Sequence, residues 1–262
     1  MTYTIKFSAR SDVGHVRTNN EDNLYCGGVT MTVSSRERPF FLNGISAVPS
    51  VFAVFDGMGG EDCGELASLT AAETLCEYAE RIQNGTFEDV NQFANDTNKK
   101  LISIMRTQNI QTGTTMALIS AGSESFTVHN LGDSRVYVLK DDNVILVTED
   151  HTLTAEKVRM GLITPKQALK DRDRNVLTRC LGIEDIFEVS PDFCGVFPFS
   201  ECRRAMICSD GLTDMLSHKE IADIMRKDED VPVIVNALVD SALNNGGRDN
   251  ITCIVLEFVK EE

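Results

Sequence analysis

Four short strand-like segments follow one another closely in the middle of the chain, and this spacing limits the folds that it can adopt. The turns between them carry Ala-Gly-Ser, Gly-Asp-Ser and Asp-Asp-Asn, which are typical hairpin sequences. Connections this short leave no room for the crossover that a parallel pair of strands requires. We therefore predict a meander of antiparallel strands rather than a βαβ unit. The segments are Thr114–Ser120, Ser125–Leu131, Arg135–Lys140 and Val144–Thr148.

Helical periodicity appears on both sides of these segments. Apolar residues recur at helical spacing over Gly64–Glu80 and again through Val90–Met105. Caps at Thr154 and Thr164 each predict a short helix. Later helices are expected over Ser217–Arg226 and Val231–Asn244, and further strands over Val51–Phe55, Ile186–Phe193, Arg204–Ser209 and Ile251–Val259. This order predicts an α+β fold, in which helices cover two antiparallel sheets.

The length of 262 residues permits one large domain or two small ones. No Pro-rich linker, low-complexity segment, internal repeat or change of composition divides the chain. We therefore expect a single domain over residues 1–262.

The formal net charge of −15 argues against nucleic acid and membranes as partners, because both bind basic surfaces. The eight cysteines include no Cys-x₂-Cys pair and are too few for a disulfide scaffold, so a cytoplasmic location is the simplest expectation. Met1–Arg10 lacks the apolar region of a secretory signal. No stretch approaches the roughly 18 apolar residues of a transmembrane helix.

Several acidic residues lie directly at the ends of apolar strands. A single Asp-Gly pair after a strand most often marks only a turn, but Asp56-Gly57 and Asp210-Gly211 each close an apolar segment. Glu21, Asp22, Asp133 and Asp249 also border strand-like segments. Converging carboxylates repel one another unless a cation lies among them. If these strand ends meet, the sequence predicts a site for Mg²⁺ or Mn²⁺, which prefer oxygen ligands.

Seven short stretches, taken in order, resemble the motifs of the metal-dependent protein phosphatases of the PPM (PP2C-type) family. They are Ser11–Asp22, Val54–Gly60, Thr112–Thr115, Asn130–Arg135, Asn175–Arg179, Cys208–Leu212 and Gly247–Thr252. The form Asp56-Gly57-Met58-Gly59-Gly60 is similar to the bacterial, single-domain branch. The resemblance implies a four-layer α-β-β-α sandwich, with a flap of about residues 149–182 that tunes substrate choice near the active site.

The resemblance also implies which residues bind metal. Asp56 would bridge two ions, Mn²⁺ or Mg²⁺, and the Gly57 carbonyl would bind one of them. Asp210 and Asp249 would complete the ligands of the first ion, which makes Asp56, Asp210 and Asp249 the catalytic residues. Asp133, together with Asp210, would hold a weaker third ion.

The region before the second strand-like segment carries the remaining implied roles. Glu21 and Asp22 match an acidic pair that sets the second ion. Bacterial relatives often carry Gln in place of Glu21, so we expect Asp22 to be the firmer anchor, acting from behind the direct ligands. Arg17 matches a phosphate-binding arginine, whose planar guanidinium suits bidentate contact with a phosphate.

The implied activity is hydrolysis of phosphoserine and phosphothreonine in proteins, reversing Ser/Thr kinase signalling, by a monomer. Water activated by the two ions would attack phosphorus directly, without a phosphoenzyme intermediate. Met58 stands where many animal members have His, so the proton for the leaving group is expected to come from water. None of the four histidines is assigned a catalytic role, although His151 follows Glu149-Asp150 where the flap opens.

Three other functions were compared with this one. A catalytically silent phosphoprotein-binding module on the same fold would be expected to lose metal ligands, whereas Asp56, Asp210 and Asp249 are all present. A nucleotide hydrolase of the P-loop class would need GxxxxGK[ST], which is absent. A structural Ca²⁺-binding domain would need EF-hand spacing, which no stretch has. The phosphatase therefore remains the leading hypothesis.

Overall fold

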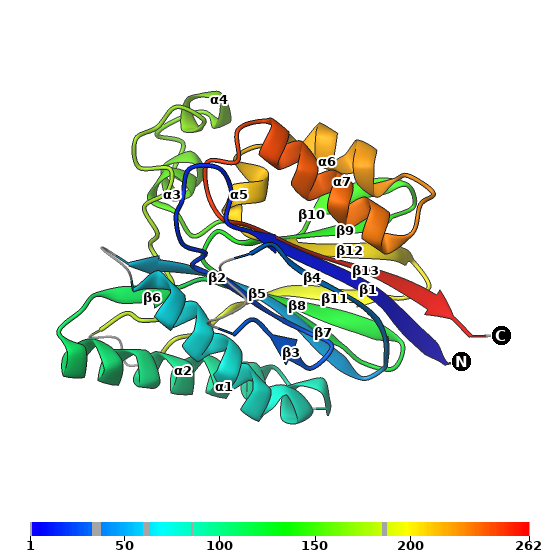
Figure 1. Cartoon of the computed structure of the whole chain (residues 1–262), viewed down its shortest axis with the longest axis horizontal. Helices are drawn as coiled ribbons and strands as arrows, with labels where there is room; N and C mark the ends of the chain where they lie inside the picture. The colour runs from blue at the N-terminus through cyan, green and yellow to red at the C-terminus, as the bar shows by residue number, and fades with distance from the viewer. Residues whose placement is uncertain (1, 33–37, 60–62, 85, 185–187, 262) are drawn as a thin grey trace.

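Two antiparallel sheets pack face to face between two pairs of helices, which gives the predicted four layers (Figure 1). The computed structural model describes residues 2–32, 38–59, 63–84, 86–184 and 188–261. Gly60 of the predicted Asp-Gly motif and Ile186–Phe187 of a predicted strand lie outside these residues. No helix within the described ranges is long and apolar enough to cross a membrane.

The first sheet pairs the two end strands of the chain. In spatial order its strands are β10 (Asn143–Leu146), β9 (Arg135–Lys140), β12 (Cys202–Cys208), β13 (Ile251–Lys260), β1 (Tyr3–Asp12) and β4 (Phe40–Ala47). Helices α6 (His218–Met225) and α7 (Val231–Asn244) cover its outer face. Successive strand residues point to opposite faces, so Met206 packs against the helices and Ile207 against the other sheet. Burial on both sides explains the apolar runs Ala205–Cys208 of β12 and Cys253–Leu256 of β13.

The second sheet carries its own pair of helices. Its strands are, in order, β11 (Asp192–Pro198), β8 (Ser125–Leu131), β7 (Met116–Ala121), β5 (Ser50–Gly59), β2 (Asp22–Cys26) and β3 (Val29–Thr30), and β6 (Thr112–Thr114) pairs with the end of β5. Helices α1 (Gly64–Asn84) and α2 (Phe87–Gln108) cover the outer face. A capping box between Thr86 and Asp89 starts α2, and Asn109 in the left-handed region ends it.

Apolar side chains fill the space between the sheets. Phe126 of β8 stacks on Phe258 of β13 with ring centroids 4.8 Å apart, and Phe199 stacks on Phe258 at 4.7 Å. Phe258 pairs with Ile5 near the start of β1, and Phe199 contacts Tyr3, so these rings lie at the end of the sandwich where the termini are found. The polar groups described below lie at the opposite end of the interface between the two sheets, which we call the seam.

The prediction of one meander is wrong in one respect. β7 pairs with β8 and β9 pairs with β10, both antiparallel, but β8 and β9 belong to different sheets. The chain crosses between the sheets at Gly132–Ser134, and Arg135 then pairs with Cys208 of β12. Short turns determine that the chain reverses, but not which neighbour each strand finds.

Two further boundaries differ from prediction. The strand expected over Ile186–Phe193 begins only at Asp192, because the backbone of Val189 exchanges two hydrogen bonds with the Asn95 side chain of α2. The cap expected at Thr154 lies at Thr152, whose hydroxyl accepts from the Ala155 amide. The cap at Thr164 is confirmed.

The flap, residues 149–182, contains α3 (Leu153–Arg159) and α4 (Pro165–Ala168) and lies beside one end of the sandwich (Figure 1). Two hydrogen bonds between Leu181 and Thr114 attach its last residues to β6. Arg174 of the flap also pairs with Asp214 at 2.8 Å. Asp214 ends the short helix α5 (Asp210–Thr213). Asp150 of the flap pairs with Arg135 of β9 at 2.6 Å, so the flap contacts both sheets.

Candidate active site at the seam between the sheets

All of the predicted carboxylates except that of Asp22 line one pocket of about 200 Å³. Asp56 comes from the second sheet, Asp210 and Asp249 border strands of the first, and Asp133 lies on the turn that crosses between them. The full lining, within the part of the chain that the structure describes, is Arg17, Glu21, Asp56, Gly57, Met58, Gly59, Thr115, Asp133, Asn175, Leu177, Asp210 and Asp249. The sequence could not show whether these strand ends meet, and in the structure they do.

Close backbone packing positions Asp56 and Gly57 at the end of β5. The Gly57 amide donates to the Glu21 carbonyl at 3.2 Å. A Cβ atom at position 57 would lie 2.1 Å from the Gly64 carbonyl oxygen and 2.5 Å from that of Glu21. Only glycine fits between these two backbones, which explains the Asp-Gly pair.

Asp22 lies behind the pocket rather than in it. It is 1% exposed, and β-sheet register places it opposite Asp56. Its Oδ2 accepts a hydrogen bond from the Ser209 hydroxyl at 2.7 Å. Ser209 precedes Asp210, so Asp22 ties the second sheet to the start of α5.

Two polar residues have structural roles that the sequence analysis did not assign. The Thr115 hydroxyl accepts from the Asp56 amide at 2.9 Å and shares a hydrogen bond with Ser134 at 2.7 Å. The Asn250 side chain accepts from the Glu21 amide at 2.7 Å and donates to the carbonyls of Val13 and Asn19. Both residues lie inside motifs that resemble the phosphatase family, Thr112–Thr115 and Gly247–Thr252, and this position was the only indication of their importance in the sequence.

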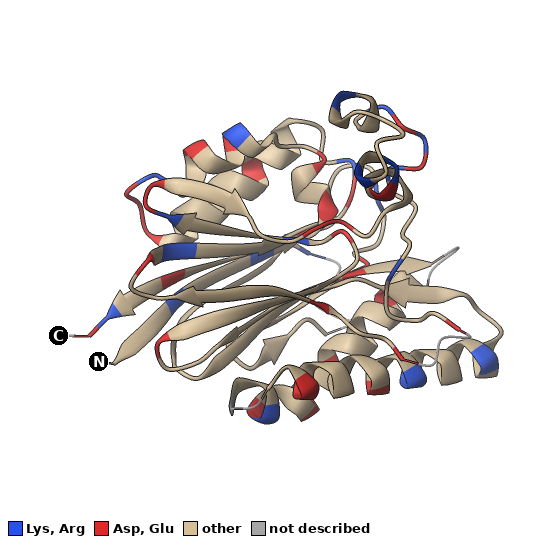
Figure 2. Cartoon of the chain, turned by 180° about the vertical axis from the view of Figure 1, so that it is seen from behind, with Lys and Arg blue, Asp and Glu red and all other residues tan. Residues whose placement is uncertain are grey.

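Burial and mutual repulsion dominate the electrostatics of the pocket. Burial, followed by the neighbouring carboxylates, raises the pKa values of Asp56 and Asp210 well above the ordinary value. Burial, and next the charge of Asp150, raises the pKa of Asp133 to about 7. Figure 2 shows acidic segments at the ends of the strands on the flap side. Such a cluster favours a cation.

Arg17 supplies a cation at the edge of the pocket. Its Nη2 lies 2.8 Å from Asp249 Oδ2, and its Nη1 lies 4.0 Å from Glu21 Oε2. The side chain is 48% exposed, so the guanidinium stays accessible from solvent. Arg17 therefore sits where an anion entering the pocket would meet it.

The donor set fits hard divalent cations. Carboxylates, the Gly57 backbone and a hydroxyl are all oxygen donors, and no cysteine or histidine in the described ranges lines the pocket. No three His, Cys, Asp or Glu side chains among the described residues yet surround a common point closely enough to hold an ion. The carboxylates face the pocket in an open arrangement, as mutual repulsion favours.

A larger, mainly apolar groove adjoins the pocket. Its volume is about 540 Å³, and Asp133 and Asp210 line both spaces. The flap and β10 supply its apolar lining, namely Leu146, Ala155, Val158, Pro165, Ala168 and Leu169. A chain segment leaving the pocket would meet this surface.

Comparison with known proteins gives consistent matches along the chain. The model of the Protein phosphatase 2C family matches residues 36–251. The serine/threonine phosphatase stp of Listeria welshimeri is 30% identical over 255 residues, which cover 95% of this chain and 94% of that protein. The protein phosphatase PhpP of Streptococcus pneumoniae is 28% identical over 263 residues, covering 98% of this chain and 99% of its own.

Solved structures agree with the fold. The Mycobacterium tuberculosis serine/threonine phosphatase PstP/Ppp superposes with a TM-score of 0.80 at 28% identity, over 97% of this chain and 98% of that one. The catalytic domain of PstP in complex with two manganese ions gives a TM-score of 0.78 at 27% identity, over 98% and 100% of the two chains.

Proposed function

Since the chain belongs to the protein phosphatase 2C family of metal-dependent serine/threonine phosphatases, we propose that it removes phosphate from phosphoserine and phosphothreonine in proteins at the seam pocket. One observation carries this proposal. Asp56, Asp133, Asp210 and Asp249 converge from both sheets on one pocket that Arg17 borders. This arrangement combines anionic ligands for metal with a cation for phosphate.

Asp56, the Gly57 carbonyl, Asp210 and Asp249 would hold the two ions, with Glu21 as a further ligand. Asp133 would hold a weaker third ion with Asp210. Two divalent cations supply charge stabilisation for phosphoryl oxygens and lower the pKa of a water molecule.

The residues of the chain itself would bind and orient the phosphate and support the carboxylate ligands. Arg17 would exchange its contact with Asp249 for two phosphoryl oxygens, because its planar donors match a phosphate as well as a carboxylate. Thr115 and Asp22 hold the backbone and the neighbouring carboxylates at the rim of the sheets. Asn250 fixes the loop that carries Arg17 and Glu21.

The pocket supports direct hydrolysis rather than a cysteine- or histidine-bound intermediate. Neither residue type lines the described pocket, and Met58 occupies the position where a histidine could donate a proton. Thr115, the hydroxyl residue in the lining, is engaged with the Asp56 amide and Ser134. The leaving-group proton would therefore come from water.

The test is hydrolysis of p-nitrophenyl phosphate by chelator-stripped protein during titration with Mn²⁺ and, separately, Mg²⁺. We expect metal-dependent turnover in the wild type. Asp56→Asn should abolish this turnover, because the substitution weakens a ligand that both ions would share. The variant should keep the wild-type circular dichroism spectrum and should unfold cooperatively. Near wild-type turnover of this variant in saturating Mn²⁺ would contradict the two-metal assignment. No turnover by folded wild-type protein in either metal would favour the silent phosphoprotein-binding module.

The groove beside the pocket supports a role for the flap in substrate choice. A phosphorylated side chain in the pocket leaves its flanking residues over Asp133 and Asp210, where the groove begins. We propose that an apolar flanking side chain packs there against Val158 and Leu169. Burial of such a side chain contributes about 1.5–3 kcal/mol, enough to discriminate among phosphoproteins.

The biological setting is also part of the proposal. We propose a single domain over residues 1–262 that acts as a monomer in the cytoplasm, on targets of a Ser/Thr kinase and on the kinase itself. The cysteines of the described residues are not joined in disulfides, which suits a reducing compartment. The acidic composition supports phosphoproteins rather than nucleic acid as partners.

A further inference from the structure

A buried histidine connects the flap to the turn that carries Asp133. The side chain of His151 is 2% exposed. Its Nδ1 accepts a hydrogen bond from the Gly132 amide at 3.0 Å, and its own amide donates to the Gly132 carbonyl at 2.9 Å. Residues 151 and 132 are therefore joined by a side-chain and a backbone hydrogen bond, although they are 19 positions apart.

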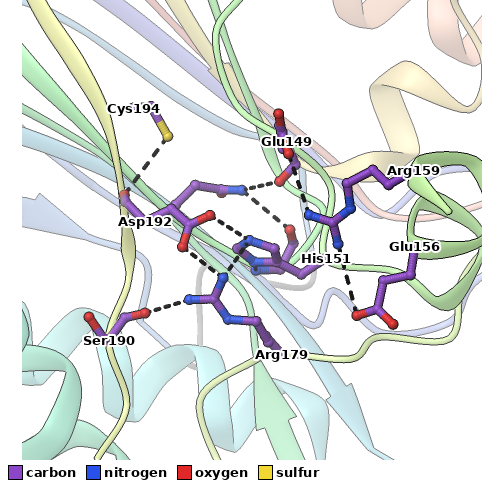
Figure 3. Close-up of polar contacts among 10 residues, drawn as sticks. Glu149, His151, Glu156, Arg159, Arg179, Ser190, Asp192 and Cys194 are labelled. Carbon is purple, nitrogen blue, oxygen red and sulfur yellow. Dashed lines mark hydrogen bonds and ion pairs between the residues drawn. The ribbon is translucent and has the colours of Figure 1, made fainter.

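Asp192 and Arg179 fix the other side of the ring (Figure 3). His151 Nε2 lies 3.0 Å from Asp192 Oδ2, and Arg179 Nη1 lies 2.7 Å from Asp192 Oδ1. Arg179 also donates to the Ser190 carbonyl. The ring is thus held between a flap residue, Arg179, and the first residue of β11.

These partners specify one form of the imidazole. Because Nδ1 accepts from the Gly132 amide, the neutral ring carries its proton on Nε2, where it points at Asp192. Arg179 Nη1 also lies 2.9 Å from Nε2, but a guanidinium only donates, so its hydrogen bond goes to Asp192 rather than to the protonated ring nitrogen. Burial, together with the nearby guanidinium of Arg179, lowers the pKa of His151 even though Asp192 opposes this. The ring is neutral at pH 7, and a second proton on Nδ1 would remove the Gly132 hydrogen bond.

The Gly132 turn has little freedom to adjust. Its φ is +110°, and a Cβ atom there would lie 2.7 Å from the Thr115 side chain. Thr115 in turn binds the Asp56 amide. A shift of this turn therefore moves Asp133 directly and presses on the residue that supports Asp56.

We propose that His151 is a positioning residue for the metal site: its Nδ1 fixes the Gly132–Asp133 turn, and Asp192 and Arg179 fix the ring. The role rests on the proposed function, since Asp133 matters only if it binds metal. His151 itself touches neither substrate nor metal. The same ring is anchored by Arg179 near the end of the flap, so flap and ligand are positioned by one group.

Two substitutions separate the two sides of the ring. In His151→Asn the amide oxygen can replace Nδ1 as the acceptor for Gly132, while contact with Asp192 is lost. In His151→Gln the longer side chain reaches toward Asp192 but leaves the Gly132 amide without its acceptor. His129→Gln is the matched control, because the whole residues are similarly buried, His129 at 2% exposed and His151 at 1%, and His129 lies on β8 and bonds Thr127 instead of the turn.

The main readout is Mn²⁺ binding by isothermal titration calorimetry on chelator-stripped protein. We expect His151→Gln to weaken the weakest Mn²⁺ site about tenfold, the effect of one lost buried hydrogen bond. His151→Asn should stay within about threefold of wild type, and His129→Gln should not change binding. KM for p-nitrophenyl phosphate should remain unchanged in all three, because Arg17 lies elsewhere.

A second readout uses the wild-type protein and does not depend on any variant folding. Ring ¹⁵N chemical shifts at pH 7 should show a neutral His151 protonated at Nε2, and the Gly132 amide should be protected from exchange. A ring protonated at Nδ1 overturns the proposal, as does equal Mn²⁺ binding by His151→Gln and His129→Gln. If wild type binds Mn²⁺ but hydrolyses no phosphomonoester, the proposed function fails while both readouts still test the position of the turn.

Discussion

Replacing Asp133 with Asn should stabilise the metal-free protein, although it removes a proposed ligand. Asp133 lies among like charges, and burial with Asp150 raises its pKa from 3.8 to about 7. The folded state therefore holds the ionised carboxylate less well than the unfolded chain does. An amide of the same shape removes that charge and keeps the packing.

The sign and size follow from linkage. A carboxyl group whose pKa is raised on folding does not lower the stability of the folded state below pH 3.8. Its destabilising effect grows as the pH rises, until the pH passes the pKa of about 7 in the folded state. The full shift corresponds to about 4 kcal/mol, and the part present at pH 5 to about 1.5 kcal/mol. Because Asp133 is only partly buried, we expect a gain of about 2–4 kcal/mol at pH 8.

The assay is urea denaturation of wild type and Asp133→Asn in chelator, at pH 5 and pH 8. Asp228→Asn provides the control, because its side chain is 93% exposed and should change stability by less than about 0.5 kcal/mol. Adding Mn²⁺ should stabilise wild type more than the variant, since binding to the folded state adds to its stability. A raised pKa of Asp133 is refuted if Asp133→Asn is no more stable than wild type at pH 8, or if the gain in stability does not grow between pH 5 and pH 8.

Three further predictions address phosphate binding, substrate choice and the core. Arg17→Ala should raise KM for p-nitrophenyl phosphate at least tenfold and leave kcat within about threefold of wild type, because a charged hydrogen bond is worth about 1.5–3 kcal/mol in the ground state and the transition state alike. The measurement is steady-state kinetics in saturating Mn²⁺, and a fall in kcat without a rise in KM would contradict this prediction. Leu169→Ser, which changes the groove, should raise KM for phosphopeptides with an apolar flank, whereas Leu162→Ser, which is similarly exposed but outside the groove, should not. Equal effects of the two substitutions on KM would show that the groove does not bind substrate. Arg204→Met should cost about 3–5 kcal/mol in urea denaturation, because the 1% exposed guanidinium pairs with Glu257 and binds three carbonyls; a loss below 1 kcal/mol would show that these contacts stabilise little.

The sequence predicted the layers because local patterns determine them. Apolar periodicity located α1 and α2, and turn sequences bounded the strand-like segments that became β8 and β9. It did not predict that β8 and β9 enter different sheets, because pairing depends on distant strands such as β12. Nor did it find the strand β11 at its true start, since a side chain of α2 takes the Val189 backbone.

The candidate site was predictable in its charged members and not in its supports. Asp56 and Asp210 are found from sequence because each ends an apolar run with Asp-Gly. The roles of Thr115 and Asn250 depend on which amides and carbonyls come within reach, and this is decided by packing between segments far apart in the chain. His151 was noted at the opening of the flap, but its partner Asp192 lies 41 residues later.

The pairing of β1 with β13 determines when the pocket can form during synthesis. All ten residues of Tyr3–Asp12 find their partners in Ile251–Lys260, so the first sheet cannot close around its centre until the last strand has left the ribosome. Contacts between segments so far apart in the sequence form late and slowly during folding. Arg17 follows β1 and Asp249 precedes β13, so nascent chains that lack β13 should lack the proposed phosphate site, and acquisition of Mn²⁺ should mark the formation of this sheet.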